Sequence, residues 1–330
     1  MKYRNLVSKL LLFILLFAAF FLPVFAELFT VQLTTIGLYL GIIAMSFIFL
    51  AGYGDMISLA QMSFVSMAGY VIAIGVMRYG LPFEVVIPLA ILGSVLLSAV
   101  FGIIAIRVHK IYFLMMTLAL SQLFYGVGMQ WASMTGGIDG YTGIPRPVFF
   151  GISLSEPVPM YFITLISTIT CYIFLQRLVQ SPFGIALQGI RDNPRRMAAL
   201  GFNVQMHRYL AIVISGFIAG IAGLLVVFFT GVVVPDRAHL PSSIQIVMAA
   251  LVGGISTLKG GILGGLLMAY LTSIAGSITI RYWTIIGSLF ILIVLFLPDG
   301  LLGTNSKLRN KILSLQKKIP FAQNGRLFDK

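Results

Sequence analysis

Residues 181–201 read SPFGIALQGIRDNPRRMAALG and separate two long apolar runs of the chain. Ser181 followed by Pro182 is a typical helix start, because a serine hydroxyl caps the first free backbone N–H groups and proline fits the first turn. Pro194 interrupts the helical pattern in the middle of the segment. The segment therefore predicts two short helices between two apolar runs.

The same segment has two chemically different faces. Ala186 and Ile190 belong to a small apolar face, and Arg191, Arg195 and Arg196 to a basic one. A surface of this kind suits the docking of a separate motor protein that transmits force to an apolar bundle. The alternative is an ordinary basic loop, of the kind that membrane proteins keep on their cytoplasmic side.

The rest of the chain is too apolar for a soluble protein. Of its 330 residues, 59% are hydrophobic and 9% are charged, whereas soluble domains are about 45–50% apolar and about 25% charged. No soluble core of this size holds such an excess, so the chain must be surrounded by lipid. Its single cysteine, Cys171, excludes an internal disulfide. We expect an all-α integral membrane protein.

Apolar runs long enough to cross a membrane recur along the chain, since about 17–25 residues span the hydrocarbon as a helix. About ten transmembrane helices are predicted, at residues 8–26, 33–51, 58–77, 84–106, 111–131, 158–176, 209–230, 244–258, 260–280 and 283–298. Run 58–77 is polar at its start, so it need not cross cleanly. Run 244–258 is short and meets the next run at paired glycines, so a broken or re-entrant segment is expected there.

Basic residues set the expected orientation, because cytoplasmic loops are enriched in lysine and arginine. With ten crossings and a cytoplasmic N-terminus, every lysine and arginine except Arg78, Arg146, Arg237 and Arg281 falls inside. Both termini are thus predicted to be cytoplasmic. The net charge of +13 then reflects topology, and no nucleic-acid surface is expected.

The two ends of the chain leave alternatives open. The first run follows Lys2 and Lys9, so a cleaved signal peptide is the alternative to a first span. Residues 1–306 are predicted to form the transmembrane domain. The tail, 307–330, has apolar residues at near-helical spacing between basic ones, which suits a helix on an anionic lipid surface. A frayed basic end is the alternative.

Several chemistries are absent from the sequence. His109, His207 and His239 lack metal-ligand spacing, and the sequence has no phosphate-binding loop and no serine-nucleophile motif. The chain is therefore predicted to be neither an enzyme nor a metal protein, and to bind no cofactor of its own. None of the nine acidic residues lies in the middle of a predicted span, which argues against a proton- or sodium-coupled carrier. Energy for transport is expected from another polypeptide.

Uncharged polar residues gather in two of the apolar runs. They are Ser58, Gln61, Ser63 and Ser66 in run 58–77, and Thr117 and Gln122 in run 111–131. Such side chains can line a route for a polar solute without the cost of a buried charge, so we predict a translocation pathway there. The alternative is hydrogen bonding between packed helices.

Glycines mark two further segments. Residues 135–145 read TGGIDGYTGIP, and this outer loop, with Gly136, Gly137, Asp139 and Gly140, is a candidate docking surface or gate. A plain turn is the alternative.

Residues 253–265 read GGISTLKGGILGG. Gly253, Gly254, Gly260 and Gly264 are assigned to close packing of helices, because glycines four residues apart let helix backbones approach. Direct contact with solute is the alternative.

These segments, in this order, resemble the LivM-type permease subunits of branched-chain amino acid ABC transporters. Residues 54–70 are similar to G-x-x-S-L-G-x-A-x-F-x-G-x-G-A-Y, and 111–119 to I-Y-F-x-x-x-T-L-A. Residues 135–145 are similar to T-G-G-x-D-G-x-x-G-I-P, 181–201 to S-P-F-G with I-R-x-N-x-x-R-A-x-x-x-G, and 253–261 to G-G-x-G-T-x-x-G-P. The likeness extends over roughly residues 33–303. Ala60, Met197, Ile255 and Gly261 depart from the patterns.

The resemblance implies a subunit of an ABC importer in the bacterial inner membrane that works by alternating access. The implied partners are a second, homologous permease, two cytoplasmic ATPases that bind ATP and Mg²⁺, and an extracytoplasmic solute-binding protein. Coupling to the ATPases is assigned to Ser181, Pro182, Phe183, Gly184, Ala186, Ile190, Arg191, Arg195, Ala198 and Gly201.

Branched-chain amino acids are the cargo that the resemblance implies. Urea or short-chain amides are the alternative cargo. A solute channel that needs no motor is the alternative of a different class.

Overall fold

A computed structural model describes residues 20, 22–23, 26–108, 110–149, 151–279, 281–296 and 300–302. The first predicted run, 8–26, lies almost wholly outside the described residues, and the tail, 307–330, lies entirely outside them.

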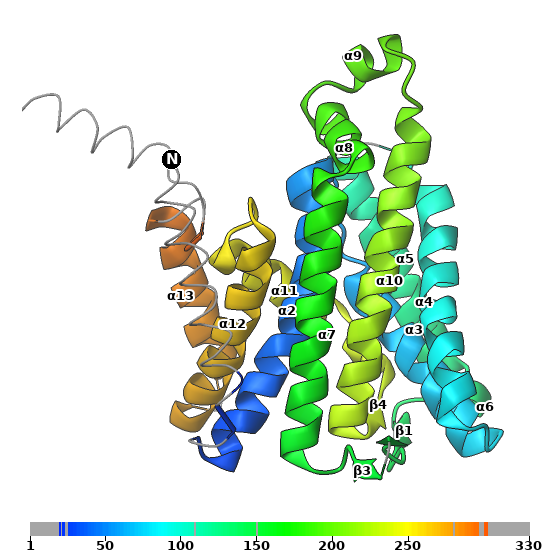
Figure 1. Ribbon diagram of the computed structural model, residues 1–330, viewed down its shortest axis with the longest axis vertical. Helices are drawn as coiled ribbons and strands as arrows, with labels where there is room; N and C mark the ends of the chain where they lie inside the picture. Colours follow the sequence, from blue (N-terminus) through cyan, green and yellow to red (C-terminus); the bar gives the residue numbers. More distant parts are fainter. Residues whose placement is uncertain are drawn as a thin grey trace, which may run out of the picture.

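The described chain is a bundle of helices with short strands at one end (Figure 1). Its elements in chain order are α2 (Leu28–Gly54), α3 (Gln61–Ala73), the π-helix η1 (Ile74–Arg78), α4 (Phe83–Ala105), α5 (Ile111–Gln130), α6 (Ala132–Thr135), β1 (Tyr141–Thr142), β2 (Val148–Phe149), β3 (Ile152–Ser153), α7 (Pro157–Gln180), α8 (Pro182–Asp192), α9 (Pro194–Ala199), α10 (Val204–Thr230), β4 (Val232–Val233), the 3₁₀-helix η2 (Pro235–Ala238), α11 (Leu240–Gly253), α12 (Leu258–Ile278) and α13 (Tyr282–Phe296).

Seven helical stretches of the described chain are long and apolar enough to cross a membrane. They are Leu28–Gly54, Gln61–Arg78, Phe83–Ala105, Ile111–Gln130, Pro157–Gln180, Val204–Thr230 and Leu258–Ile278. Two apolar helices are shorter, Leu240–Gly253 and Trp283–Ile293. The all-α membrane architecture is therefore confirmed in its coarse form.

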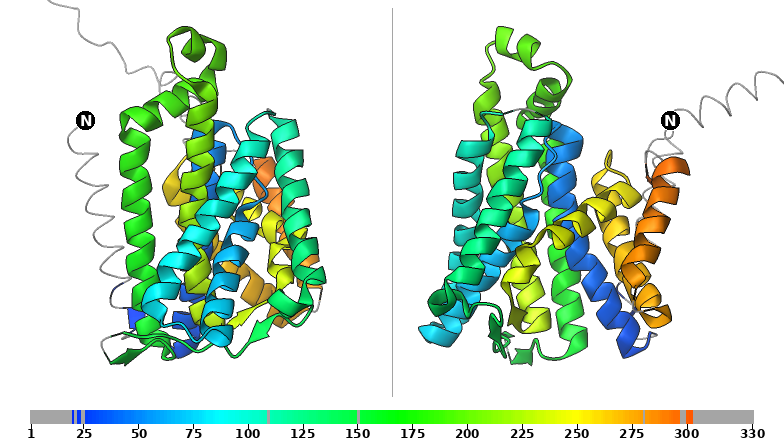
Figure 2. Two further views of the ribbon diagram at one scale, coloured as in Figure 1. Left: turned by 90° about the vertical axis from the view of Figure 1, so that its right-hand side faces the viewer. Right: turned by 180° about the vertical axis from the view of Figure 1, so that it is seen from behind.

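The middle of the bundle is built from antiparallel helix pairs. α2 packs along α12, where Gly37 lies against Leu266 and Gly41 against Ile262. α10 packs along α4 in the same way, and Gly220 faces Ser94. Because a glycine has no side chain, the helix axes come close at each of these points. α13 lies along α12 at one flank (Figure 1 and Figure 2).

The prediction of a broken hairpin near residue 253 is confirmed, but the predicted run 244–258 has the wrong bounds. Helix α11 begins earlier, at Leu240, and ends at Gly253, and residues 254–257 form the turn into α12. Gly254 has a φ of 117°, a backbone conformation that favours glycine. The predicted run ends too late because it extends past Gly253 and Gly254 to Leu258.

Two connections inside the bundle are not α-helical. The first comprises residues 55–60 and begins at Asp55, which has a left-handed φ of 55° and ends α2. Residues 231–239 comprise β4, η2 and their flanks. η2 packs on α5: Pro235 packs on Gly128, and the Ser121 hydroxyl donates to the Ala238 carbonyl oxygen at 3.2 Å. Irregular backbone within a membrane protein is tolerated where protein surrounds it.

The two ends of the bundle differ. α8 and α9 project from one end, called here the α8–α9 end, and the strands and α6 cover the other, called the strand end (Figure 1). At the strand end β1 pairs with β4 in antiparallel fashion, with Tyr141 opposite Val233, and β2 pairs with β3. The predicted outer residues Arg78 and Arg146 bond to chain segments at the strand end. Arg237, also predicted outside, follows β4 on η2 and bonds to Thr230 at the end of α10.

Candidate functional site

Helix α8 is fixed to the end of α7 by its N-cap and by close packing of its buried side. The Ser181 hydroxyl accepts a hydrogen bond from the Gly184 N–H at 3.4 Å and so caps the helix. Gly184 is buried against the Leu178 and Val179 carbonyl oxygens, where an added Cβ would overlap the backbone. Ala186 and Ile190 are buried as well. The prediction of two short helices broken at Pro194 is confirmed by α8 and α9.

Arg191 links α8 to the end of α2. Its Nη1 donates to the Gly52 carbonyl oxygen at 2.8 Å, and its Nε and Nη2 lie 3.0 Å from the Asp192 carboxylate. The free carbonyls at a helix C-terminus favour a cation. A displacement of α8 therefore acts directly on the end of α2, three residues before the irregular segment 55–60 begins.

Helix α9 stands further out from the bundle. The Asn193 side chain caps it, accepting from the Arg196 N–H at 3.0 Å, and Met197 packs on Gly189 of α8. α9 has no buried residue. The Met197 departure from the family pattern thus places an apolar side chain between the two short helices.

The predicted coupling residues fall into two groups. Gly184, Ala186 and Ile190 face the bundle, whereas Pro182, Arg191, Arg195, Ala198 and Gly201 are exposed and Ser181 and Phe183 are half-buried. Sequence reasoning missed two large exposed apolar residues, Ile185 at 62% and Leu200 at 67% exposure. Together with Arg195 and Arg196 they form what we call the α8–α9 outer face. The apolar pattern alone could not show which side of α8 is covered.

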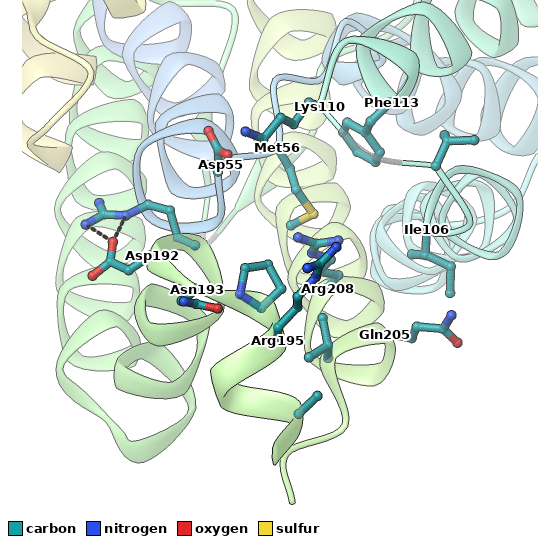
Figure 3. A pocket seen from close by; sticks show the side chains of 15 residues that line it. Asp55, Met56, Ile106, Lys110, Phe113, Asp192, Asn193, Arg195, Gln205 and Arg208 are labelled. Carbon is teal, nitrogen blue, oxygen red and sulfur yellow. Dashed lines mark hydrogen bonds and ion pairs between the residues drawn. The ribbon is translucent and has the colours of Figure 1, made fainter. Parts of the chain in front are cut away.

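A cleft of about 800 Å³ opens beside this face (Figure 3). Asp55 and Lys110 lie on one wall, and Arg195 and Arg208 lie across from them. Met56, at the start of the irregular segment 55–60, also lines the cleft. The cleft therefore joins the α8–α9 end to the segment that carries the first predicted pathway residue, Ser58.

The predicted pathway residues lie mostly between α3, α5 and α10. Gln61 donates through Nε2 to Ser215 at 3.0 Å and accepts from Ser46 at 3.1 Å. The hydroxyls of Ser63 and Ser121 are 2.8 Å apart. The Thr117 hydroxyl accepts from the Leu59 N–H at 3.2 Å. Ser58 is buried, and its hydroxyl accepts from the Ala60 N–H. The bonds of Gln61 and Ser63 join packed helices, which is the alternative interpretation of these residues. The Thr117 bond joins α5 to segment 55–60, and the Ser58 bond lies within that segment.

Four buried polar atoms nearby have no hydrogen-bond partner in the described part of the chain. They are Ser66 Oγ and Tyr70 Oη on α3, Gln122 Nε2 on α5 and Ser243 Oγ on α11. A buried polar atom left unpaired is costly, so such atoms call for water or a polar ligand. We call these four the unpaired polar set. Tyr70 and Ser243 were not predicted, because one polar residue in an apolar run gives no distinct signal.

The predicted outer loop forms tight turns at the strand end. Gly136, Gly137 and Gly140 have φ values of 76°, 62° and 63°, in the left-handed region. Gly140 lies against the backbone of Val233 and Val234. The loop is therefore packed on the start of segment 231–239, and Asp139 is exposed.

The glycine segment 253–265 packs in two directions. Gly253 and Gly260 face each other across the turn, and Gly264 lies against the Ala249 carbonyl oxygen of α11. Gly261 and Gly265 lie against the α2 backbone at Met45 and Gly41. Gly254 is enclosed by Gly300. No group of three or more His, Cys, Asp or Glu residues that could hold a metal occurs among the described residues.

Residues 29–297 match the protein family described as branched-chain amino acid transport system, permease component. The chain belongs to this family. This permease is 23% identical to the high-affinity branched-chain amino acid transport system permease protein LivM of Escherichia coli (strain K12), over 89% of this chain and 75% of the relative.

The permease is also similar to two other proteins. It is 25% identical to the ribose import permease protein RbsC of Haemophilus influenzae, over 71% of this chain and 73% of the relative. It is 32% identical to the probable branched-chain amino acid transport permease protein LivH of Methanocaldococcus jannaschii, over 46% and 50%. No solved structure gives a significant match.

The family fixes the general role of the permease. It is a multi-pass membrane protein and the membrane-spanning component of an ABC importer, and it is not the ATPase. Permeases of this kind work with an ATPase and a solute-binding protein.

Proposed function

We propose that this permease imports branched-chain amino acids across a bacterial inner membrane by alternating access. The observation that supports it best is the α8–α9 outer face. It exposes Ile185 on α8, Arg195 and Arg196 on α9 and Leu200 just after α9, while the other face of α8 is anchored on α7 and α2. An ATPase that docks there is able to move the ends of two long helices.

We propose that a movement of α8 reaches the pathway through a series of contacts. Arg191 bonds to Gly52 at the end of α2. The irregular segment 55–60 follows and leads to Gln61, which is bonded to Ser46 of α2 and Ser215 of α10. A shift of α2 against α10 therefore changes the bonding of Gln61. The unpaired polar set lies on α3, α5 and α11 and is proposed to contact solute and water as it passes.

The assembly is proposed to contain a homologous second permease, two ATPases and an extracytoplasmic binding protein. ATP and Mg²⁺ bind to the ATPases. About ten helices are proposed to cross the membrane, with both termini and the α8–α9 end cytoplasmic. The strand end then receives the binding protein, and the cleft beside Asp55 and Arg208 releases the solute inward.

The experiment that tests the function is uptake by cells with and without this gene. Labelled leucine, urea and ribose are supplied in parallel. ATP is depleted in one arm, and in another the proton gradient is collapsed at constant ATP. We expect leucine uptake to need the gene and ATP but not the gradient.

The other outcomes are equally informative. Gene-dependent uptake of urea with unchanged leucine uptake supports the alternative cargo, and ribose uptake supports the cargo named for RbsC. Gene-dependent uptake that ignores ATP supports a channel and contradicts the importer. Uptake that stops when only the gradient is collapsed supports a proton-coupled carrier.

A further inference from the structure

Arg237 is a charged residue inside the bundle. It lies on η2, between Pro235, which packs on Gly128 of α5, and Ala238, whose carbonyl accepts from Ser121 near the middle of α5. Its side chain is half-buried. An ionised side chain partly buried in an apolar helix bundle is costly, and in membrane proteins such a residue usually marks a site where an ion or polar solute binds.

The Arg237 guanidinium has few polar contacts in the described chain. Its Nη2 donates to the Thr230 hydroxyl at 3.2 Å. No Asp or Glu oxygen lies within 4.0 Å of it in the described chain, where the one ion pair joins Arg191 and Asp192. The neighbouring Asp236 is exposed. A guanidinium has five N–H donors, and the bond to Thr230 uses one of them.

Two other arginines at the strand end each form two hydrogen bonds through their guanidinium groups. Arg146 donates to the Ser155 and Phe229 carbonyl oxygens at 3.2 and 2.9 Å. Arg78 donates to the Ser133 carbonyl oxygen at 2.9 Å and to Met134 Sδ at 3.2 Å. Both hold loops or a helix end in place. Arg237 bonds instead to a hydroxyl that also donates to the Val226 carbonyl oxygen.

We propose that Arg237 binds the carboxylate of the solute as it enters from the strand end. The inference rests on the proposed function and makes it more specific. A carboxylate matches the planar fork of a guanidinium and forms two charge-assisted hydrogen bonds with it. Arg237 thereby favours amino acids over uncharged solutes such as urea or ribose, which gain no ion pair. It is a specificity residue of the pathway, contributed by the irregular segment 231–239.

The test uses the complete transport complex in proteoliposomes, with its binding protein. The variants are Arg237→Gln, Arg237→Met and Arg237→Lys, and Arg78→Gln is the control at the same end. We expect the first two to lower the maximal rate of leucine uptake by about tenfold or more, the range that loss of a charged hydrogen bond gives. Arg237→Lys keeps the charge and recovers part of the rate, and Arg78→Gln stays near the parent.

Two further measurements distinguish a carboxylate of the solute from a carboxylate of the binding protein. Binding of leucine-loaded binding protein to the complex, and the basal ATPase rate, are expected to stay unchanged in Arg237→Gln. A loss of that binding assigns the carboxylate to the binding protein and overturns the proposal. Parent-like uptake by Arg237→Gln or Arg237→Met also overturns it, as does failure of both to assemble, which shows a purely structural role. A parent complex that carries no leucine contradicts the proposed function instead.

Discussion

Gly264 in α12 lies against the Ala249 carbonyl oxygen, where a Cβ would overlap the α11 backbone. Gly276, in the same helix, has open space around it. We expect Gly264→Val to destabilise the folded permease by about 1–3 kcal/mol, because packed backbones do not accept the added volume. Gly276→Val is the matched control and is expected to stay within about 0.5 kcal/mol. Equal stabilities of the two variants in detergent would show that α11 and α12 are not in close contact.

Gln61 is the residue at which three helices meet, since it bonds to Ser46 of α2 and Ser215 of α10. A double-mutant cycle with Gln61→Ala and Ser215→Ala measures this bond. Hydrogen bonds between membrane helices contribute about 0.6 kcal/mol on average and about 1.7 kcal/mol at most, and we expect a coupling energy in that range. Additive effects of the two substitutions would mean that the bond does not form in the membrane.

At the scale of elements, α8 and α9 have an anchoring side and an exposed side. Bulky residues at Gly184 or Ala186 would push α8 off α7, so they test folding and not docking. Ile185→Ser with Leu200→Ser tests docking, because both side chains are exposed. We expect the pair to weaken ATPase binding by about tenfold or more, as loss of interface anchors does. Ile138→Ser, at the strand end and 75% exposed, is the control. If the double variant binds the ATPase as tightly as the control does, α8–α9 is not the docking site.

The link between α8 and α2 makes a separate prediction. Arg191→Ala removes the bond to Gly52, and with it the contact through which α8 acts on α2. We expect the ATPases to bind and hydrolyse ATP, while uptake per ATP falls several-fold. Arg177→Ala, on α7, is the control, since Arg177 is exposed and no bond of its side chain to α2 is seen among the described contacts. An unchanged ratio of uptake to hydrolysis in Arg191→Ala would show that force takes another route.

For the whole molecule, the orientation is open to a labelling test. Cys171 is the single cysteine and is buried, so introduced cysteines report alone. An impermeant maleimide is expected to label Ile138→Cys in intact cells. Leu200→Cys is expected to react only after the membrane is opened. The reverse pattern would place the α8–α9 end outside.

The sequence predicted the membrane class and the helix break at Pro194, because both depend on local composition and on proline geometry. It could not predict that Gly184 and Ile190 face inward, since either face of α8 is a plausible contact face. It also could not predict that η2 packs on α5, where the Ser121 hydroxyl donates to the Ala238 carbonyl oxygen. Long-range contacts decide these positions, and a single sequence does not record them.

ATP hydrolysis at the α8–α9 end is proposed to drive import of a branched-chain amino acid through this permease. The most direct measurement is leucine accumulation in proteoliposomes that contain the purified complex, with leucine-loaded binding protein and ATP on opposite sides of the membrane. We predict accumulation above the outside concentration only when ATP faces the α8–α9 end and the binding protein faces the strand end. Leucine that only equilibrates, or that moves equally well without ATP, would contradict the account.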